Sequence, residues 1–315
     1  MSPPHPSIVV LFGGVGPERE VSLRSGATVR EALRCRVPGE VEGPVVQARE
    51  LAEPSLPPGL DPEREVILPI LHGEYGEDGT LQAELEATGF AYAGSDARAS
   101  RLCMDKVAAR DRVAAAGVPV PPGWNGGGPG GPTAEALRDR LGEACVAKPR
   151  RGGSSVGVHL WRGLSEVEQG LAALGEGEWL FERFVPGREI SVGMLGDEVL
   201  GIVEVLPDQE IFDYEHKYTE GASRYRAPAK LSEGEAAAVA GLARTAFRAC
   251  GCRDFGRVDF RLEGEQPWFL EINTLPGMTA QSLYPRSAAA HGLDLPALVR
   301  AMVAPALERF REGRG

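Results

Sequence analysis

Two runs of apolar residues near the start of the chain, each followed by glycines, set the first structural expectation. Residues 7–12 have the pattern of a buried strand that ends in glycines, and an apolar repeat of helical period follows over 19–33. A second apolar run, over 66–71, leads into the loop LHGEYGEDG and a predicted helix over 80–88. Such strand–loop–helix units are typical of a doubly wound α/β fold, so we predict a parallel sheet within residues 1 to about 100.

The middle of the chain alternates short helices, short strands and glycine-rich turns. A helical pattern over 104–116 ends at VPVPPG, and residues 119–132 are so rich in Gly and Pro that we predict a loop there. Beyond this loop the patterns predict a compact α+β part, with helices over 134–141 and 165–174 and strands over 144–148 and 158–162.

The second half of the chain is rich in strands that follow one another closely. WLFE, EISVGML and VLGIVEVL each have strand character, and further strands are predicted over 257–262 and 268–272. Helices are predicted over the alanine-rich segment 233–250 and over 295–311. Short connections between strands favour antiparallel pairing, so we expect an antiparallel sheet with helices packed against it.

Composition and charge exclude several classes of protein. Hydrophobic residues make up 43% of the 315 residues and charged residues 25%, as in ordinary globular proteins, so the chain is neither disordered nor fibrous. The formal net charge of -11 would repel a polyanion, and we expect no nucleic-acid partner. The apolar runs are too short for a signal or membrane-spanning segment, so we expect no membrane partner and a cytoplasmic location. The 5 cysteines include no Cys-x-x-Cys pair, which argues against a disulfide framework or a zinc site and fits a reducing compartment.

The predicted hairpin FGRVDFRLEGEQPWFLEINT brings two carboxylates together. If its turn is centred near Glu265, pairing by equal steps places Asp259 directly opposite Glu271, and strand alternation adds Asn273 to the same face. Opposed like charges are destabilising unless something compensates for them, and an all-oxygen cluster suits a hard cation such as Mg²⁺. The alternative is a solvated outer face on which Arg257 and Arg261 balance the charge.

A glycine loop follows the strand that ends at Lys148. In RRGGSSVG, the backbone N–H groups and the hydroxyls of Ser154 and Ser155 could bind phosphate oxygens together with the lysine, although such a loop can also be a plain turn. No Walker A motif is present, and the earlier GGVGPE lacks the third glycine of a dinucleotide fingerprint because Arg19 stands there.

Two further features are candidates for function. FDYEHKYTEGASRYRAP mixes aromatic residues with both charge signs and is either a mobile lid or a surface loop. His72 follows a buried strand and precedes a glycine-rich loop, so it either binds a substrate or caps that loop.

Taken in order, these motifs resemble the ATP-grasp family, and within it the D-alanine–D-alanine ligases. The resemblance covers nearly the whole chain and rests on GGVGPEREVSLRSG, LHGEYGEDGT, MDK, AKPRRGGSSVG, FERFVPGRE, FDYEHKY, GRVDF and EINTLPGMTAQSLYP. It implies an ATP-grasp fold with an N-terminal Rossmann-like domain (1–100), a small central α+β domain (101–186) and a C-terminal α+β domain with an antiparallel sheet (187–315). It further implies a cytoplasmic enzyme, expected as a homodimer, that ligates two D-alanines for peptidoglycan synthesis.

The resemblance also implies a nucleotide site and a metal site. It makes Lys106 and Lys148 phosphate contacts and Ser155 an ATP contact, and it places Glu182 at the adenine, Glu189 at the ribose hydroxyls, and Phe184 and Val185 near the base. The predicted ligands of two Mg²⁺ or Mn²⁺ ions are Asp259, Glu271 and Asn273, in agreement with the hairpin argument.

The remaining roles concern the two D-alanines. The resemblance implies that Glu18 receives the ammonium of the first D-alanine, unless it merely caps the helix that follows, and that Arg257 and the backbone of Gly277 stabilise a tetrahedral oxyanion. Ser282 and Leu283 match the site for the second carboxylate. Lys217 and Tyr218 belong to the lid, where Tyr218 and Ser154 would connect to Glu18 and close the site.

Two alternatives to D-alanyl-D-alanine synthesis stay open. One is a relative that makes D-alanyl-D-lactate or a product with another D-amino acid. The other is a nucleotide-binding protein without ligation, against which Glu18, Arg257 and Tyr218 argue. Phe212 stands where the family commonly has a tyrosine, a departure that does not touch the chemistry.

Overall fold

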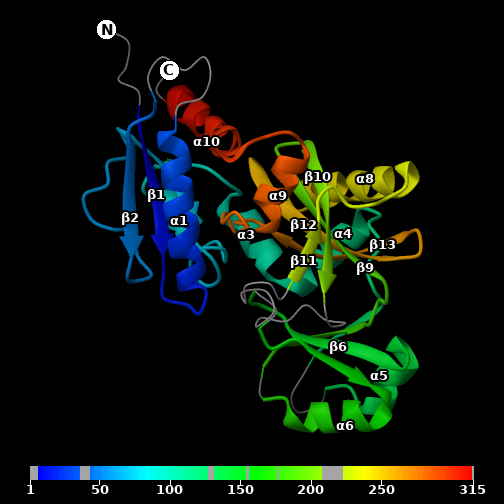
Figure 1. Ribbon diagram of the computed structural model, residues 1–315. Coiled ribbons are helices and arrows are strands. Elements are labelled where there is room, and N and C mark those ends of the chain that lie inside the picture. The colour runs from blue at the N-terminus through cyan, green and yellow to red at the C-terminus, as the bar shows by residue number, and fades with distance from the viewer. Residues whose placement is uncertain are drawn as a thin grey trace.

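Three separate sheets organise the chain, whose structure is a computed structural model describing residues 6–35, 43–126, 131–153, 156–175, 177–207 and 223–313. The sheets contain four, four and five strands. Figure 1 shows the first sheet on the left, the third on the right and the second below the third. A parallel α/β sheet is thus followed by two antiparallel α+β parts, which confirms the predicted fold class.

The first sheet is parallel, as predicted, in the order β2 (Val46–Leu51), β1 (Ser7–Gly13), β3 (Glu65–Ile70) and β4 (Ala91–Tyr92). Helices cover both of its faces: Ile8 and Val10 pack in one cluster with α1 (Arg19–Arg34) and α10 (Leu295–Glu312), while Val9 and Leu11 pack with α2 (Thr80–Ala87). Strands β2 and β4 were not predicted, because β2 is a largely polar edge strand and β4 has only two residues.

The second sheet is antiparallel, in the order β5 (Gly123–Asn125), β8 (Trp179–Arg183), β6 (Ala144–Pro149) and β7 (His159–Arg162). Helices α5 (Ala134–Leu141) and α6 (Gly163–Ala173) pack against it. Strand β5 lies inside the segment predicted as a loop. That prediction was wrong for these three residues because backbone pairing with β8 decides their conformation.

The third sheet is antiparallel, in the order β11 (Ser223–Arg226), β10 (Glu198–Pro207), β9 (Arg188–Leu195), β12 (Phe255–Glu263) and β13 (Gln266–Asn273). Four helices contact it: α3 (Ala97–Met104), α4 (Lys106–Ala115), α8 (Glu233–Ala249) and α9 (Leu283–Ala290). The helix predicted to begin at 104 begins instead at 106, because Asp105 ends α3 and its carboxylate caps α4 through Val107 and Ala108.

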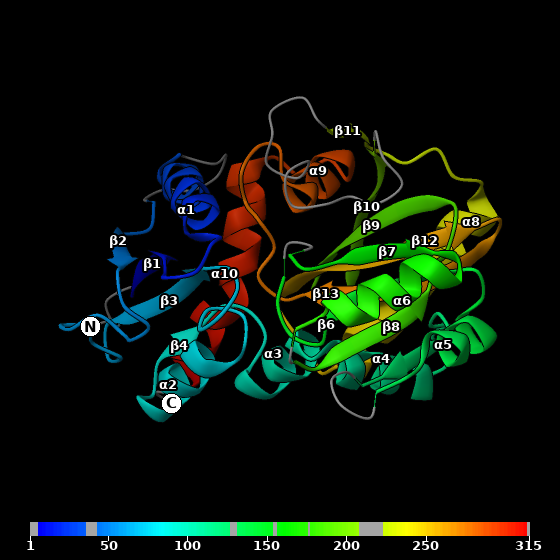
Figure 2. The ribbon, with the colours of Figure 1, turned by 90° about the horizontal axis from the view of Figure 1, so that it is seen from below.

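Helix α10 returns from the end of the chain to the first sheet. It begins at the Asp294 cap with Pro296 in its first turn, where the missing backbone N–H of proline removes no helical hydrogen bond. Figure 2 shows α10 between the first and third sheets, where its apolar side contacts α1, β3 and β4. The predicted domain boundaries stay a prediction, and any division has to accommodate this contact. Within the described ranges, no helix has the length and apolar character needed to cross a membrane.

Candidate active site

Two neighbouring cavities lie where elements of the three sheets approach one another. The larger, of about 710 Å³, is lined by α1, the loop after β3, the glycine loop and the segment from β13 to α9. The smaller, of about 140 Å³, lies between the second and third sheets. Six residues line both cavities: Lys106, Gly152, Gly153, Arg257, Glu271 and Leu283. Molecules held in the two cavities would therefore meet across these residues.

The β12–β13 hairpin pairs Asp259 with Glu271 and Arg257 with Asn273 on the same face. The predicted opposition of the two carboxylates is therefore present. Asp259 and Arg257 are buried, with 8% and 9% exposed, and Glu271 and Asn273 are half-buried, so the alternative of a solvated outer face was wrong.

Arg257 compensates for the charge of Asp259. Its Nε and Nη2 atoms donate to the Asp259 carboxylate at 2.9 to 3.1 Å, and Ser191 Oγ donates to the same carboxylate at 2.7 Å. Burial alone would lower the pKa of Arg257, but the charge and hydrogen bonds of Asp259, with the charge of Glu271, raise it. The guanidinium therefore stays positively charged beside the two carboxylates.

The hairpin residues fit a hard cation. Asn273 Oδ1 is buried and has no hydrogen-bond partner among the described residues, which leaves a carbonyl oxygen for an ion. Asp259 and Glu271 add carboxylate oxygens, the ligands that Mg²⁺ and Mn²⁺ prefer. In the described ranges no group of three or more His, Cys, Asp or Glu side chains converges as a metal site, so a cation here would depend on the amide of Asn273 as well.

Glu182, which lines the smaller cavity, binds two cationic side chains. This buried carboxylate pairs with Lys148 Nζ through one oxygen and with Arg110 Nη1, at 2.8 Å, through the other. Lys148 and Glu182 are neighbours because β6 and β8 pair with each other. Sequence reasoning missed Arg110, which reaches the site from α4 and has no motif of its own.

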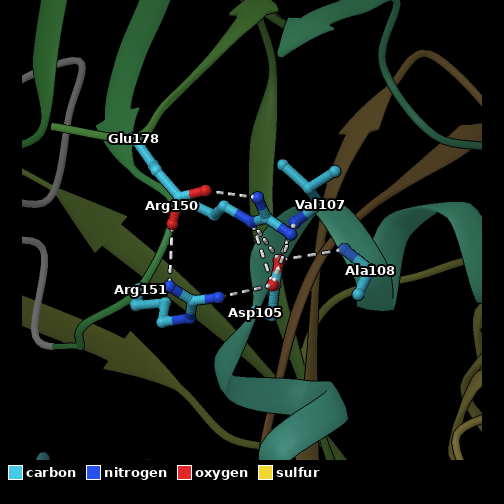
Figure 3. A network of polar contacts seen from close by, with 6 residues as sticks. All are labelled: Asp105, Val107, Ala108, Arg150, Arg151 and Glu178. Carbon is cyan, nitrogen blue, oxygen red and sulfur yellow. Dashed lines mark hydrogen bonds and ion pairs between the residues drawn. The ribbon is translucent and has the colours of Figure 1, made fainter. Parts of the chain in front are cut away.

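The glycine loop is tied to the start of α4. Asp105 accepts hydrogen bonds from Arg150 Nε at 2.8 and 2.9 Å, and Glu178 binds both Arg150 and Arg151 (Figure 3). Lys106 follows directly: its backbone N–H donates to the carbonyl of Arg150, and its ammonium group donates to the carbonyl of Gly152. This network places Lys106 beside the loop that was predicted to bind phosphate.

Phe184, Val185 and Glu189 line the smaller cavity, together with Glu182. The guanidinium of Arg261 lies 5.4 Å from the centre of the Phe184 ring, and that of Arg162 lies 5.3 Å from it. Arg261 also donates to the carbonyl of Val185 at 3.1 Å and contacts Glu189. The four side chains predicted around the nucleoside are therefore held in one place by the second and third sheets.

Glu18 lies at the entry of α1, but its side chain makes no capping hydrogen bond, so the capping interpretation was wrong. The carboxylate is buried at the larger cavity, close to two glycines. A Cβ atom would lie 3.0 Å from Glu18 Oε2 if built on Gly73 and 3.4 Å if built on Gly153. Glycine at these positions lets two loops approach the carboxylate closely.

His72 and Glu77 also line the larger cavity. His72 Nδ1 contacts the carbonyl of Leu275 at 3.0 Å, while its buried Nε2 has no partner within the described part of the chain. Burial lowers the pKa of His72, so the ring is neutral near pH 7. Burial, followed by the charge of Glu18, raises the pKa of Glu77 to about 8. Glu77 was missed by the sequence analysis, although it lies in the same glycine-rich loop as His72.

Gly277, Ser282 and Leu283 complete the larger cavity on the side of α9. Ser282 Oγ accepts a hydrogen bond from the backbone N–H of Thr279 at 3.1 Å. A Cβ atom on Gly277 would lie 2.9 Å from Ser282 Oγ, so glycine is needed for this close approach. The predicted oxyanion donor and the predicted carboxylate site are therefore neighbours.

The family comparison agrees with this arrangement. Residues 131–304 match the family model described as D-ala D-ala ligase C-terminus. A D-alanine–D-alanine ligase from Desulforudis audaxviator is 39% identical over 308 residues, which cover 96% of this chain and 99% of that protein. This chain belongs to the D-alanine–D-alanine ligase family. A ligase from Syntrophobacter fumaroxidans is 38% identical and covers 98% of this chain.

Solved structures of ligases have the same fold. The D-alanine–D-alanine ligase from Bacillus anthracis complexed with ATP has a TM-score of 0.81 at 26% identity and covers 98% of this chain and 99% of its own. The VanG D-Ala:D-Ser ligase from Enterococcus faecalis has a TM-score of 0.78 at 25% identity and covers 96% of this chain and 99% of its own. The resemblance inferred from the motifs is confirmed at the level of family and fold.

Most of the predicted ligase residues meet at the two cavities. Glu18, His72, Gly277 and Ser282 line the larger, the predicted nucleotide residues Lys148, Glu182, Phe184, Val185 and Glu189 line the smaller, and Lys106, Arg257, Glu271 and Leu283 line both. Asp259 lines the smaller cavity and Asn273 the larger. Ser154, Ser155, Lys217 and Tyr218 lie outside the described residues. The individual roles of all these residues stay predictions.

Proposed function

We propose that this chain is an ATP-dependent ligase that joins two D-alanines into D-alanyl-D-alanine for peptidoglycan synthesis. The observation that carries the proposal is the pair of adjoining cavities, in which Lys106, Arg257 and Glu271 line both the nucleotide side and the substrate side. The names of the most similar relatives and the ATP complex of the Bacillus anthracis ligase support the same activity.

The proposed reaction has two steps. A carboxylate oxygen of the first D-alanine attacks the terminal phosphorus of ATP, and ADP leaves, which gives an acyl phosphate. The amine of the second D-alanine then attacks the acyl carbon, and the tetrahedral intermediate loses phosphate to give the dipeptide. Two adjoining cavities suit this order because the carboxylate has to meet first a phosphoryl group and then an amine.

Glu18 and Arg257 would act on opposite ends of the first D-alanine. The buried carboxylate of Glu18 favours a cationic partner and would receive the ammonium group. Arg257 uses Nε and Nη2 to bind Asp259, so Nη1 would donate to the developing oxyanion together with the backbone N–H of Gly277. Ser282 and the backbone of Leu283 would bind the carboxylate of the second D-alanine, with His72 nearby.

Lys148 would change partner when the nucleotide binds. It is bound to Glu182 in this structure, and we expect it to turn toward phosphate oxygens while Glu182, still held by Arg110, accepts from the adenine amino group. Lys106, Ser155 and Glu189 would contact the rest of the nucleotide. Phe184 and Val185 would pack against the base.

Two Mg²⁺ or Mn²⁺ ions would be held by Asp259, Glu271 and Asn273, and the feature that supports them is the Asn273 oxygen, which has no hydrogen-bond partner among the described residues. Bound there, they would neutralise charge on the phosphate oxygens during transfer. Lys217, Tyr218 and Ser154 would close the site over the substrates. We also propose a cytoplasmic homodimer and three domains with the boundaries predicted from the sequence.

Two other activities can be distinguished from this one by the products that form. The similarity to a D-Ala:D-Ser ligase keeps a different second substrate open, such as D-serine or D-lactate. A nucleotide-binding protein without ligase activity would bind ATP in the smaller cavity but make no product.

Phosphate release measured with and without D-alanine, with products identified by mass, distinguishes the three. We expect ADP and phosphate to appear only when D-alanine is present, together with D-alanyl-D-alanine. Formation of AMP and pyrophosphate would exclude the acyl phosphate route. A phosphinate analogue of the dipeptide should become phosphorylated in the site and inhibit slowly and tightly.

A further inference from the structure

Three of the five cysteines, far apart in the sequence, meet in the structure. All five are free thiols. The Sγ atoms of Cys103, near the end of α3, and Cys252, after α8, are 3.5 Å apart. Cys250 also contacts the Cys103 thiol, and all three pack in the same apolar cluster. No sequence motif indicates this cluster, because its two halves are about 150 residues apart.

The cluster lies at the wall of the larger cavity and is partly exposed through Cys252. Cys103 is buried but lines the larger cavity, and Cys252 is partly exposed. The other two cysteines differ in one respect each: Cys35 is exposed outside this cluster, and Cys145 is buried in the core of the second sheet. The chain therefore also has one exposed cysteine and one buried cysteine that do not belong to the cluster.

The surroundings favour thiol chemistry. Arg112 brings a positive charge to the cluster, and thiolates are stabilised by nearby cations. A hydrogen bond from Cys103, helped by Arg112 and opposed by burial, lowers the pKa of Cys250. The hydrogen bonds to Cys250 and Cys252, with burial, raise the pKa of Cys103, so its thiol is protonated near pH 7.

We propose that Cys103 and Cys252 are a peroxide-sensitive pair that oxidises to a disulfide in the wall of the larger cavity. The Cys252 sulfur attacks a peroxide oxygen, the O–O bond breaks, and a sulfenic acid forms with release of one water. Cys103 then attacks that sulfur, the S–S bond forms, and the S–O bond breaks. The Cys103 proton leaves with the hydroxide as a second water. Two thiols are oxidised and one peroxide is reduced.

Oxidation of this pair should affect the site. The sulfurs have to come closer than their present separation, which pulls on the end of α3. Asp105 and Lys106 follow directly and carry the hydrogen bonds that tie α4 to the glycine loop. We therefore expect turnover to fall on oxidation and to return when a thiol reductant breaks the disulfide.

Peptide mapping tests the pair independently of the proposed ligase activity. The full-length protein is reduced, treated with hydrogen peroxide, alkylated and digested with trypsin, which releases LCMDK with Cys103 and ACGCR with both Cys250 and Cys252. We expect these peptides joined, with a mass lower by two hydrogens than the sum of the reduced peptides and raised by one alkyl group on Cys250. The Cys250→Ala variant has to keep the cross-link if the partner is Cys252. Absence of the link in that variant, or three thiols that stay separately alkylated, overturns the proposal.

Turnover measurements are the second test of the cysteine pair. Peroxide should lower the turnover of the wild type and of Cys35→Ser, the matched control with an exposed cysteine removed, and a reductant should restore both. Cys252→Ser should resist the same treatment. An equal fall in turnover in Cys252→Ser would show that peroxide acts elsewhere, which contradicts the effect of the pair on the site.

Discussion

Replacing Arg110 by methionine should weaken ATP binding while leaving the D-alanine cavity intact. The Arg110 and Glu182 side chains are only 14% and 5% exposed, and they are joined at 2.8 Å. Without Arg110, Lys148 has to neutralise the buried Glu182 carboxylate, so it is less available to phosphate oxygens. Arg110 lines neither cavity and would act through Glu182, which lines only the smaller one, so the effect should be confined to the nucleotide.

The size of the effect follows from the hydrogen bond that the substitution removes. A hydrogen bond between charged groups contributes about 1.5–3 kcal/mol, and about 1.4 kcal/mol corresponds to a tenfold change in binding. If the free energy of nucleotide binding becomes less favourable by this amount, the KM for ATP should rise roughly ten- to a hundredfold. The KM for D-alanine should change by less than about twofold, because the residues around it are unchanged.

Steady-state kinetics with ATP and D-alanine varied separately measure both constants. Arg110→Lys keeps the positive charge and should recover part of the ATP affinity, whereas Arg112→Met, on the exposed side of the same helix, should have none of these effects. Gly123→Ala is a second way to disturb the contact between Arg110 and Glu182, because the new Cβ atom would lie 2.2 Å from Arg110 Nη1. An Arg110→Met enzyme with wild-type KM for ATP and wild-type thermal stability would refute the reasoning.

Three further predictions concern the metal, the lid and a buried acid. Glu271→Gln should sharply reduce Mg²⁺-dependent turnover with an unchanged circular dichroism spectrum, and normal ligation at limiting Mg²⁺ would contradict the metal assignment. Tyr218→Phe should gain D-alanyl-D-lactate synthesis, chiefly at low pH where the competing amine is protonated; competition of D-alanine with D-lactate over about pH 6 to 9 measures it, and an unchanged product ratio assigns Tyr218 only to packing. Since burial raises the pKa of Glu77 to about 8, the folded protein binds more protons than the unfolded chain below that pH and loses stability as the pH rises toward it. Glu77→Gln should therefore gain stability relative to the wild type between about pH 5 and 8 in urea unfolding, and a difference independent of pH would contradict the raised pKa.

The hairpin shows how far a strand pattern can predict a site. Pairing by equal steps about Glu265 correctly predicted Asp259 opposite Glu271. The same pairing places Leu262 opposite Trp268, which was wrong, because Leu262 pairs with Pro267. A bulge between Asp259 and Phe260 shifts the register by one residue, so that the pairing at the carboxylates is the predicted one. Alternation predicted which side chains share a face, but no pattern in the sequence predicts a bulge.

The residues missed by sequence reasoning act through interactions between distant segments. Arg110 reaches Glu182 from 72 residues away, and Asp105 reaches Arg150 from 45 residues away. From the sequence, a charged residue on a helix is expected only to be exposed. The carboxylate that it binds depends on how the helix packs, which the sequence pattern does not show. The motifs of the candidate site could be found because their spacing is local, whereas the side chains that hold them in place could not.

Helix α10 has a consequence for synthesis of the protein on the ribosome. Its side chains Leu298, Val299, Met302 and Val303 complete the same apolar core as Ile8 and Val10 of the first strand. Arg300 donates to the carbonyls of Ala32 and Leu33 at the end of α1. The first sheet leaves the ribosome early, and α1 covers part of this face, but the rest stays open until α10 has been made. The nascent chain must therefore keep an exposed apolar surface until α10 emerges, so folding of the N-terminal sheet is coupled to synthesis of α10, and termination before α10 would leave this surface open to aggregation.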